Sequence, residues 1–128
     1  MSLKRINISE DFWRGVKEHV MELLAGDILQ AGVALIKPGE RYPPQGYSSH
    51  SESDELSFMF SGTLKFCTDK EEIVLKPGDL LLNPKGTPHY IENIGDEEVR
   101  VLWVLAPKVT LPPLKRVGFS RSASALRI

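Results

Sequence analysis

Residues 78–93 read GDLLLNPKGTPHYIEN: three leucines pass into a turn rich in proline and glycine, and a histidine follows at once. Proline fixes φ and glycine permits a positive φ, so residues 84–88 predict a sharp and rigid corner. The corner leads into a strand in which His89, Ile91 and Asn93 share one face, because side chains alternate between the two faces of a strand. A histidine held at the start of a strand in this way is well placed to act as a metal ligand or an acid/base.

The rest of the chain reads mainly as short strands separated by turns that contain glycine, proline or aspartate. An apolar run over residues 27–39 comes first, and a polar, turn-rich loop over residues 41–53 follows it. We then expect strands over residues 55–60, 63–68, 71–75, 79–83, 89–93 and 99–106. Many short strands at close spacing are typical of an antiparallel sandwich or barrel, so the sequence predicts an all-β fold.

One segment near the N-terminus has the periodicity of a helix. Residues 9–26 begin with a serine suited to an N-cap and end with a glycine suited to a helix stop. Apolar side chains recur along this segment at the spacing of one helix face: Phe12, Val16, Val20, Leu23 and Leu24. We therefore expect one N-terminal α-helix outside the barrel, within an N-terminal segment of residues 1–26.

The composition narrows the class of protein. The chain has 128 residues, of which 41% are hydrophobic, and this suits one domain of ordinary size. A net charge of −1 gives no reason to expect a nucleic-acid or membrane partner. The single cysteine, Cys67, cannot form an internal disulfide, and no apolar run is as long as a membrane span, so we expect a soluble, cytoplasmic protein. All acidic residues precede residue 99, and the basic tail is expected to be a solvated segment or an arm on a partner's acidic surface.

The loop before residue 55 supplies further candidate ligands. In the following strand Glu55, Ser57 and Met59 share one face, and we expect the leucine and two phenylalanines between and after them to form the packing face. His50 lies a few residues upstream, and Ser48 shares its parity.

His50, Glu55 and His89 can therefore converge inside one barrel. Two imidazoles and one carboxylate suit a divalent transition metal with open coordination positions. We expect the pocket around them to be lined by inward side chains: Ser48, Ser57, Met59, Ile91 and Asn93. The inward faces offer no obvious additional acid or base, so catalytic residues stay unassigned.

Two motifs in the chain resemble those of the cupin superfamily, a group of small β-barrels. The second cupin motif reads G, five residues, P, one residue, G, two residues, H, three residues, N, and it is met here by Gly78, Pro84, Gly86, His89 and Asn93. The first motif reads H, one residue, H, three or four residues, E, six residues, G, and it is met by His50, Glu55 and Gly62. The resemblance implies an antiparallel double-stranded β-helix, or jelly-roll barrel, over residues 27–107, followed by an extended tail over residues 108–128.

The chain departs from the first motif at its first histidine, which falls on Ser48. In the family the histidines and the glutamate bind iron, manganese, nickel, zinc or copper. The resemblance therefore implies a divalent transition metal at His50, Glu55 and His89. A serine hydroxyl is a weak neutral ligand, so the site has three ligands or is vestigial, unless Glu52 or Tyr47 takes the fourth position.

Two classes of function are compatible with these residues. The resemblance implies an enzyme of the oxygenase, isomerase or decarboxylase type that acts on a small organic acid or phenol. The alternative is a barrel with no metal, or with a vestigial site, that binds or senses a small effector without catalysis. In either case we expect a homodimer, because proteins usually cover or pair the exposed strand edges of a small barrel.

Overall fold

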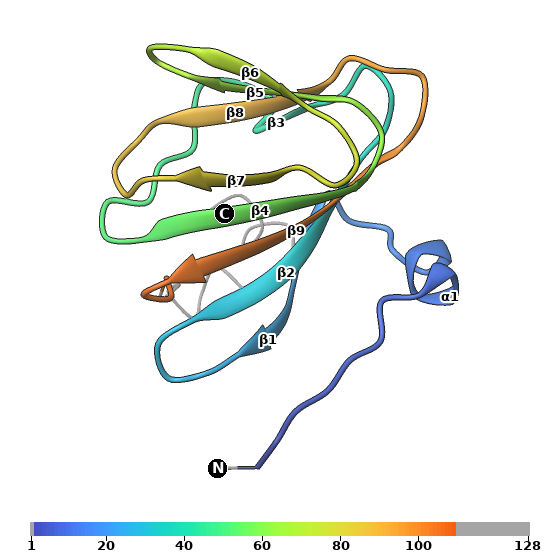
Figure 1. The fold of residues 1–128 in the computed structure, drawn as a ribbon, viewed down its shortest axis with the longest axis vertical. Helices are drawn as coiled ribbons and strands as arrows, with labels where there is room; N and C mark the ends of the chain where they lie inside the picture. Colours follow the sequence, from blue (N-terminus) through green and yellow to red (C-terminus); the bar gives the residue numbers. More distant parts are fainter. Residues whose placement is uncertain (1, 110–128) are drawn as a thin grey trace.

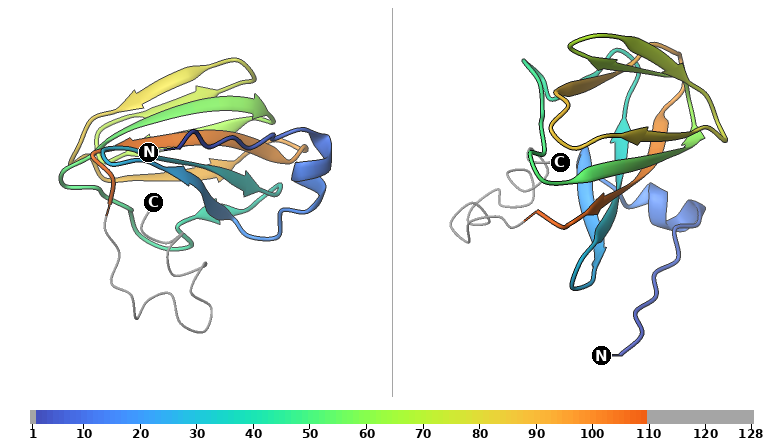
Figure 2. Two further views of the ribbon diagram at one scale, coloured as in Figure 1. Left: turned by 90° about the horizontal axis from the view of Figure 1, so that it is seen from below. Right: turned by 60° about the vertical axis from the view of Figure 1, so that its left-hand side comes forward.

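The computed structural model describes residues 2–109, which form two antiparallel sheets and one short helix. The five-stranded sheet has the order β1 (Val20–Ala25), β2 (Gln30–Ile36), β9 (Val99–Ala106), β4 (Asp54–Ser61), β7 (Leu80–Asn83). The four-stranded sheet has the order β3 (Arg41–Tyr42), β8 (His89–Asn93), β5 (Leu64–Thr68), β6 (Glu72–Leu75). The two sheets face each other in Figures 1 and 2, and this confirms the predicted jelly-roll barrel.

Side chains between the two sheets form the main core. Strand pairing sets the faces: opposite residues of antiparallel neighbours point to the same side, so Ser57 and its partners Trp103 and Leu81 all face inward. The core cluster is made of side chains from both sheets, among them Ile36, Met59, Leu64, Val99 and Leu105. No helix of residues 2–109 has the length and apolarity that crossing a membrane requires.

The N-terminal helix is present but shorter than predicted. Helix α1 spans Glu10–Arg14, and Val20–Ala25 forms strand β1 instead of continuing the helix. Gly15 ends the helix, and β1 then pairs with β2 from Val20↔Ala34 to Ala25↔Gln30. The apolar stripe from Phe12 to Leu24 was a false helix signal, because a strand that covers the edge of β2 can use the same side chains.

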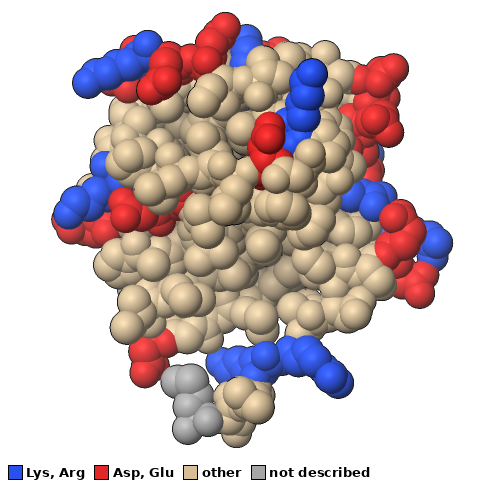
Figure 3. Space-filling view, viewed as in Figure 1, with Lys and Arg blue, Asp and Glu red and all other residues tan. Residues whose placement is uncertain are grey.

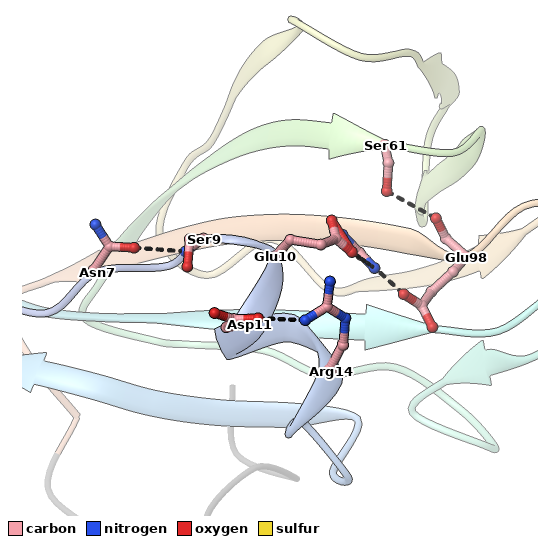
Figure 4. Close-up of polar contacts among 8 residues, drawn as sticks. Asn7, Ser9, Glu10, Asp11, Arg14, Ser61 and Glu98 are labelled. Carbon is pink, nitrogen blue, oxygen red and sulfur yellow. Dashed lines mark hydrogen bonds and ion pairs between the residues drawn. The ribbon is translucent and has the colours of Figure 1, made fainter.

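Helix α1 lies outside the barrel against the five-stranded sheet, as predicted (Figures 1 and 2). The Arg100 guanidinium of β9 donates to both carboxylate oxygens of Glu10, at 2.8 and 3.1 Å, and to Glu98 at 2.8 Å. Figure 4 shows these carboxylates converging beside the helix. Trp13 is buried with its ring 5.9 Å from that of Phe60, so the helix covers one end of the sheet's outer face.

Strand β4 turns the face with Glu55 into the barrel, as expected, but its other face is not the main packing face. Glu55, Ser57 and Met59 are buried inside the barrel, whereas Leu56 and Phe60 are more than a third exposed on the outside. The prediction that the leucine and phenylalanines form the packing face was therefore wrong. The apolar side chains point outward because the inward face carries the polar groups of the candidate site.

Candidate metal centre

The corner before His89 joins the two loops that carry the predicted ligands. Gly86 has a φ of +79°, a conformation that favours glycine, and its N–H donates to the backbone oxygen of His50 at 2.8 Å. The next N–H upstream, that of Lys85, donates to the side chain of Asp54 at 2.9 Å. The turn therefore positions His89 and also holds the segment that contains His50 and Glu55.

A second backbone connection places Ser48 directly beside His89. The two residues form an isolated antiparallel bridge in which each N–H donates to the other's carbonyl oxygen at 2.8 Å. Opposite residues of such a pair project their side chains to the same face. Ser48 therefore lies on the inward side next to His89, where the fourth ligand of the motif would stand.

The structure brings the three predicted ligands together. His50, Glu55 and His89 are all buried, and each offers a ligand atom within 4.8 Å of the others. Nε2 of His89 lies 3.2 Å from Oε1 of Glu55, and the two imidazole rings are 5.4 Å apart between centroids.

The neighbours of His89 fix the orientation of its ring. Nδ1 lies 3.3 Å from the carbonyl oxygen of Thr87 and 3.3 Å from the side-chain amide of Asn83. The ring of Phe66 is stacked on the imidazole at 5.3 Å with an interplanar angle of 4°. A proton on Nδ1, donated to Thr87, leaves the Nε2 lone pair facing Glu55, which is the arrangement that second-sphere partners give a metal-binding histidine.

Burial governs the protonation of Glu55. Desolvation raises the pKa of its carboxyl group from 4.5 to about 8, because the charged form is disfavoured away from water. Because burial favours the protonated carboxyl group, Glu55 can donate a proton to Nε2 of His89 across their 3.2 Å contact. A divalent cation would take the place of that proton and stabilise the carboxylate.

The donor set fits a divalent transition metal. Imidazole nitrogen and carboxylate oxygen bind such ions at about 2.0–2.2 Å, so donors on one ion are at most about 4.4 Å apart. Closing a 4.8 Å separation to this range takes about half an ångström, which side-chain rotation can supply. Two histidines and one carboxylate also leave coordination positions open, as in sites that bind a substrate or an oxidant.

Of the other residues predicted to line the pocket, some border a cavity beside the triad and others lie elsewhere in the barrel. Ser57 and Ile91 line a small interior cavity, of about 40 Å³, together with Glu55 and His89. Met59 is fully buried in the apolar core.

Asn93 uses its side chain to hold backbone. Its amide donates to the carbonyl oxygens of Ile36 and Glu97 and accepts from the N–H of Gly95. The motif asparagine thus stabilises the loop at the far end of β8, where it can be replaced only by a side chain with both a donor and an acceptor.

Sequence reasoning missed three residues near the site: Tyr42, Phe66 and Asn83. Tyr42 and Phe66 line the interior cavity, and Asn83 contacts His89. Asn83 and Phe66 lie in predicted strands, and their parity relative to Glu55 and His89 was an available signal. Tyr42 lay in a segment predicted to be loop, whereas it pairs with Ile91 in strand β3.

Comparison with known proteins agrees with this architecture. A family model described as a cupin domain matches residues 32–105. A Streptomyces cyaneus protein described as polyketide synthase CurC is 33% identical over 86 residues, which are 67% of this chain and 54% of that protein. The chain therefore spans about half the length of this curated relative.

Solved structures show the same fold. A Bacillus halodurans protein of known crystal structure superposes with a TM-score of 0.72 at 22% identity, covering 84% of this chain and 83% of that chain. The DMSP lyase DddQ from Ruegeria pomeroyi gives a TM-score of 0.59 at 25% identity, covering 68% of this chain and 42% of that one.

The raised pKa of Glu55 predicts that metal affinity depends on pH. The metal binds the ionised carboxylate, so below pH 8 each unit of falling pH should weaken binding by up to about tenfold, and above pH 8 the affinity should level off. Zinc calorimetry between pH 6 and 9, run in two buffers of different ionisation enthalpy, measures both the affinity and the protons released. An affinity that stays constant from pH 6 to 8 would contradict the assignment of Glu55 as a ligand.

The corner itself can be tested with two matched glycines. Gly86 and Gly39 have φ values of +79° and +82°, and neither has an atom within 4 Å of an added Cβ. Replacing either by alanine should cost about 1–2 kcal/mol of folding free energy in urea denaturation. Only Gly86→Ala should also weaken zinc binding, by about tenfold, because it strains the turn that orients both ligand loops. Equal zinc affinity in the two variants would show that the corner does not control the site.

Proposed function

The chain belongs to the cupin family, and from this membership we propose that it binds a divalent transition metal through His50, Glu55 and His89. The observation that supports the proposal is the convergence of these buried donors within 4.8 Å. Iron, manganese, nickel, zinc and copper all accept such a donor set, so the metal is left as a class.

We further propose that the metal centre acts on a small organic acid or phenol, by oxygenation, isomerisation or decarboxylation. The bound metal would supply a Lewis acid for the substrate's oxygen atoms. The similarity to a protein described as a polyketide synthase, and the fold shared with a lyase, support an enzyme rather than a structural role.

The cavities indicate how an organic acid would reach the site. The interior cavity of about 40 Å³ has room beside the triad for only a few atoms. A cleft of about 270 Å³ lies at the loop of His50 and is lined also by Ser49, Glu52 and Lys108. A larger cleft, of about 460 Å³, contains none of the three ligands, so we place the substrate's bulk in the cleft beside His50. The chain's own residues then bind the body of the acid there, while its oxygen atoms enter the interior.

A metal-free binding module is the second candidate. The absence of a histidine at Ser48 and the small volume beside the triad favour it. The expected cytoplasmic location stays a prediction under both functions.

Metal titration separates the two candidates. Apo-protein should bind zinc or Fe²⁺ in calorimetry with modest affinity, and His89→Ala should abolish binding. Ser48→His should tighten it by about tenfold, because Ser48 already lies on the inward face beside His89. His19→Ala is the matched control, since this histidine contacts Glu40 away from the triad and its loss should change nothing.

A parent protein that binds no metal, with a Ser48→His variant that gains none, would favour the metal-free module. If His89→Ala still binds the metal, the metal site lies elsewhere in the chain.

We also propose that the protein is a homodimer formed through the outer face of the five-stranded sheet. On the edge strand β7, Leu80 and Leu82 are 64% and 58% exposed, and Leu56 of β4 lies opposite Leu82. Figure 3 shows uncharged side chains across the middle of one face of the molecule, with most charges near its rim. An uncharged apolar patch is complementary to itself, as a two-fold interface requires. The expected arm on a partner surface, residues 108–128, lies outside the described residues from residue 110 onward.

Sedimentation tests the dimer. The parent should sediment as a dimer at micromolar concentration, and a Leu80→Glu/Leu82→Glu double variant should be monomeric, because charge would be buried at the interface. Ile73→Glu, at an exposed position on β6 of the other sheet, should leave the dimer intact. A monomeric parent would remove the proposal, and a dimer that survives the double variant would place the interface elsewhere.

A further inference from the structure

Two buried hydroxyl groups inside the barrel have no hydrogen-bond partner among residues 2–109. These are Oη of Tyr42 and Oγ of Ser48, in side chains that are 6% and 8% exposed. A buried hydroxyl without a partner destabilises a protein, and such groups are rare in folded structures. The two hydroxyls, here called the hydroxyl pair, therefore need a partner that residues 2–109 do not provide.

Both members of the hydroxyl pair lie on the inward face of the four-stranded sheet. Tyr42 is the register partner of Ile91, and Ser48 is the bridge partner of His89. His89 and Ile91 are two residues apart on β8, so the side chains of all four residues project into the barrel. Tyr42 also lines the interior cavity that Glu55 and His89 line.

The surroundings keep the Tyr42 hydroxyl a donor. Burial raises the pKa of the phenol well above its usual range, so it retains its proton throughout the physiological pH range. Serine also carries a proton that it can donate. Apart from Ser57, the rest of the cavity is bounded by apolar side chains, including those of Leu64, Val101 and Trp103, so water competes poorly for these donors.

We propose that Tyr42 and Ser48 donate hydrogen bonds to the oxygen atoms of a carboxylate that binds beside the metal triad. This inference rests on the proposed function and narrows its ligand to a small carboxylic acid, or to the carboxylate head of a larger one. A carboxylate supplies two acceptor oxygens, which matches two unpaired donors. Its few atoms also suit a cavity of about 40 Å³, which excludes the bulk of a larger molecule.

A carboxylate bound in this way would explain why a serine, Ser48, occupies the position of the motif's first histidine. A fourth imidazole would occupy a coordination position, and its remaining N–H would point away from the metal and from a ligand bound there. The serine leaves that position open and offers a hydrogen bond next to it. Tyr42 and Ser48 are positioning residues in this scheme, because they orient the carboxylate rather than change its bonds.

Formate, the smallest carboxylate, is the probe for this site. NMR titration of the zinc-loaded protein with formate should show binding in the parent and roughly fivefold to tenfold weaker binding in Tyr42→Phe and in Ser48→Ala. The matched controls are Tyr47→Phe, at an exposed neighbour in the same loop, and Ser9→Ala, at an exposed residue before helix α1; both should bind formate as the parent does. Zinc affinity should be the same in all five proteins.

Thermal unfolding provides a readout that does not depend on the ligand. Without formate, Tyr42→Phe should melt at the same temperature as the parent or higher, because the variant removes a buried hydroxyl that lacks a partner. Added formate should raise the melting temperature of the parent more than that of either variant.

The outcomes separate this inference from the proposed function. Equal formate affinity in the parent, Tyr42→Phe and Ser48→Ala would overturn the inference. A lowered melting temperature of Tyr42→Phe with unchanged formate binding would also overturn it, because the Tyr42 hydroxyl would then be hydrogen-bonded to an ordered water. A loss of zinc affinity in Ser48→Ala would overturn the role given to Ser48 and make it a metal ligand. If the parent binds no zinc, the proposed function fails, and the same formate titration on the metal-free protein decides the inference by the same comparison.

Discussion

The hydrogen bond from the Gly86 N–H to the backbone oxygen of His50 is the contact on which the rest of the site depends. It joins a corner between β7 and β8 to a loop that precedes β4, and so it connects residues from the two sheets. The Ser48–His89 bridge adds a second connection between the same two loops. The backbone thus places both histidines, and the contacts of His89 with Thr87, Asn83 and Phe66 then orient its ring toward Glu55.

Polar and apolar side chains both point into the barrel interior. Met59 of β4 and its register partner Val101 of β9 are buried in the apolar core, whereas Glu55, on the same face of β4, lies beside His89. Burying these polar groups lowers the free energy of unfolding, and a bound ligand that pairs with them raises it again. The outer face of β4 carries apolar side chains instead, and helix α1 covers only one end of it. The site and the proposed dimer surface are therefore the two faces of one sheet.

Most of the fold and the candidate ligands could be predicted from local signals. Turn residues marked the ends of the strands from residue 54 onward. The spacing of the two motifs identified His50, Glu55 and His89 as candidate ligands. The end of α1 at Arg14 could not be predicted, because the pairing of β1 with β2 is a long-range contact that overrides the helical stripe. The outer face of β4 was misjudged for another reason: alternation separates the two faces of a strand but does not say how much of the apolar face is covered. Tyr42 was missed because its strand is only two residues long.

Anomalous X-ray diffraction from crystals of the zinc-loaded protein, recorded at the zinc edge, would locate the metal and its ligands. We expect one strong peak inside the barrel, about 2.0–2.2 Å from a nitrogen of each of His50 and His89 and from a carboxylate oxygen of Glu55. A peak at His19 and Glu40, or no peak within the barrel, would contradict the claim that the corner at Gly86 assembles a metal centre.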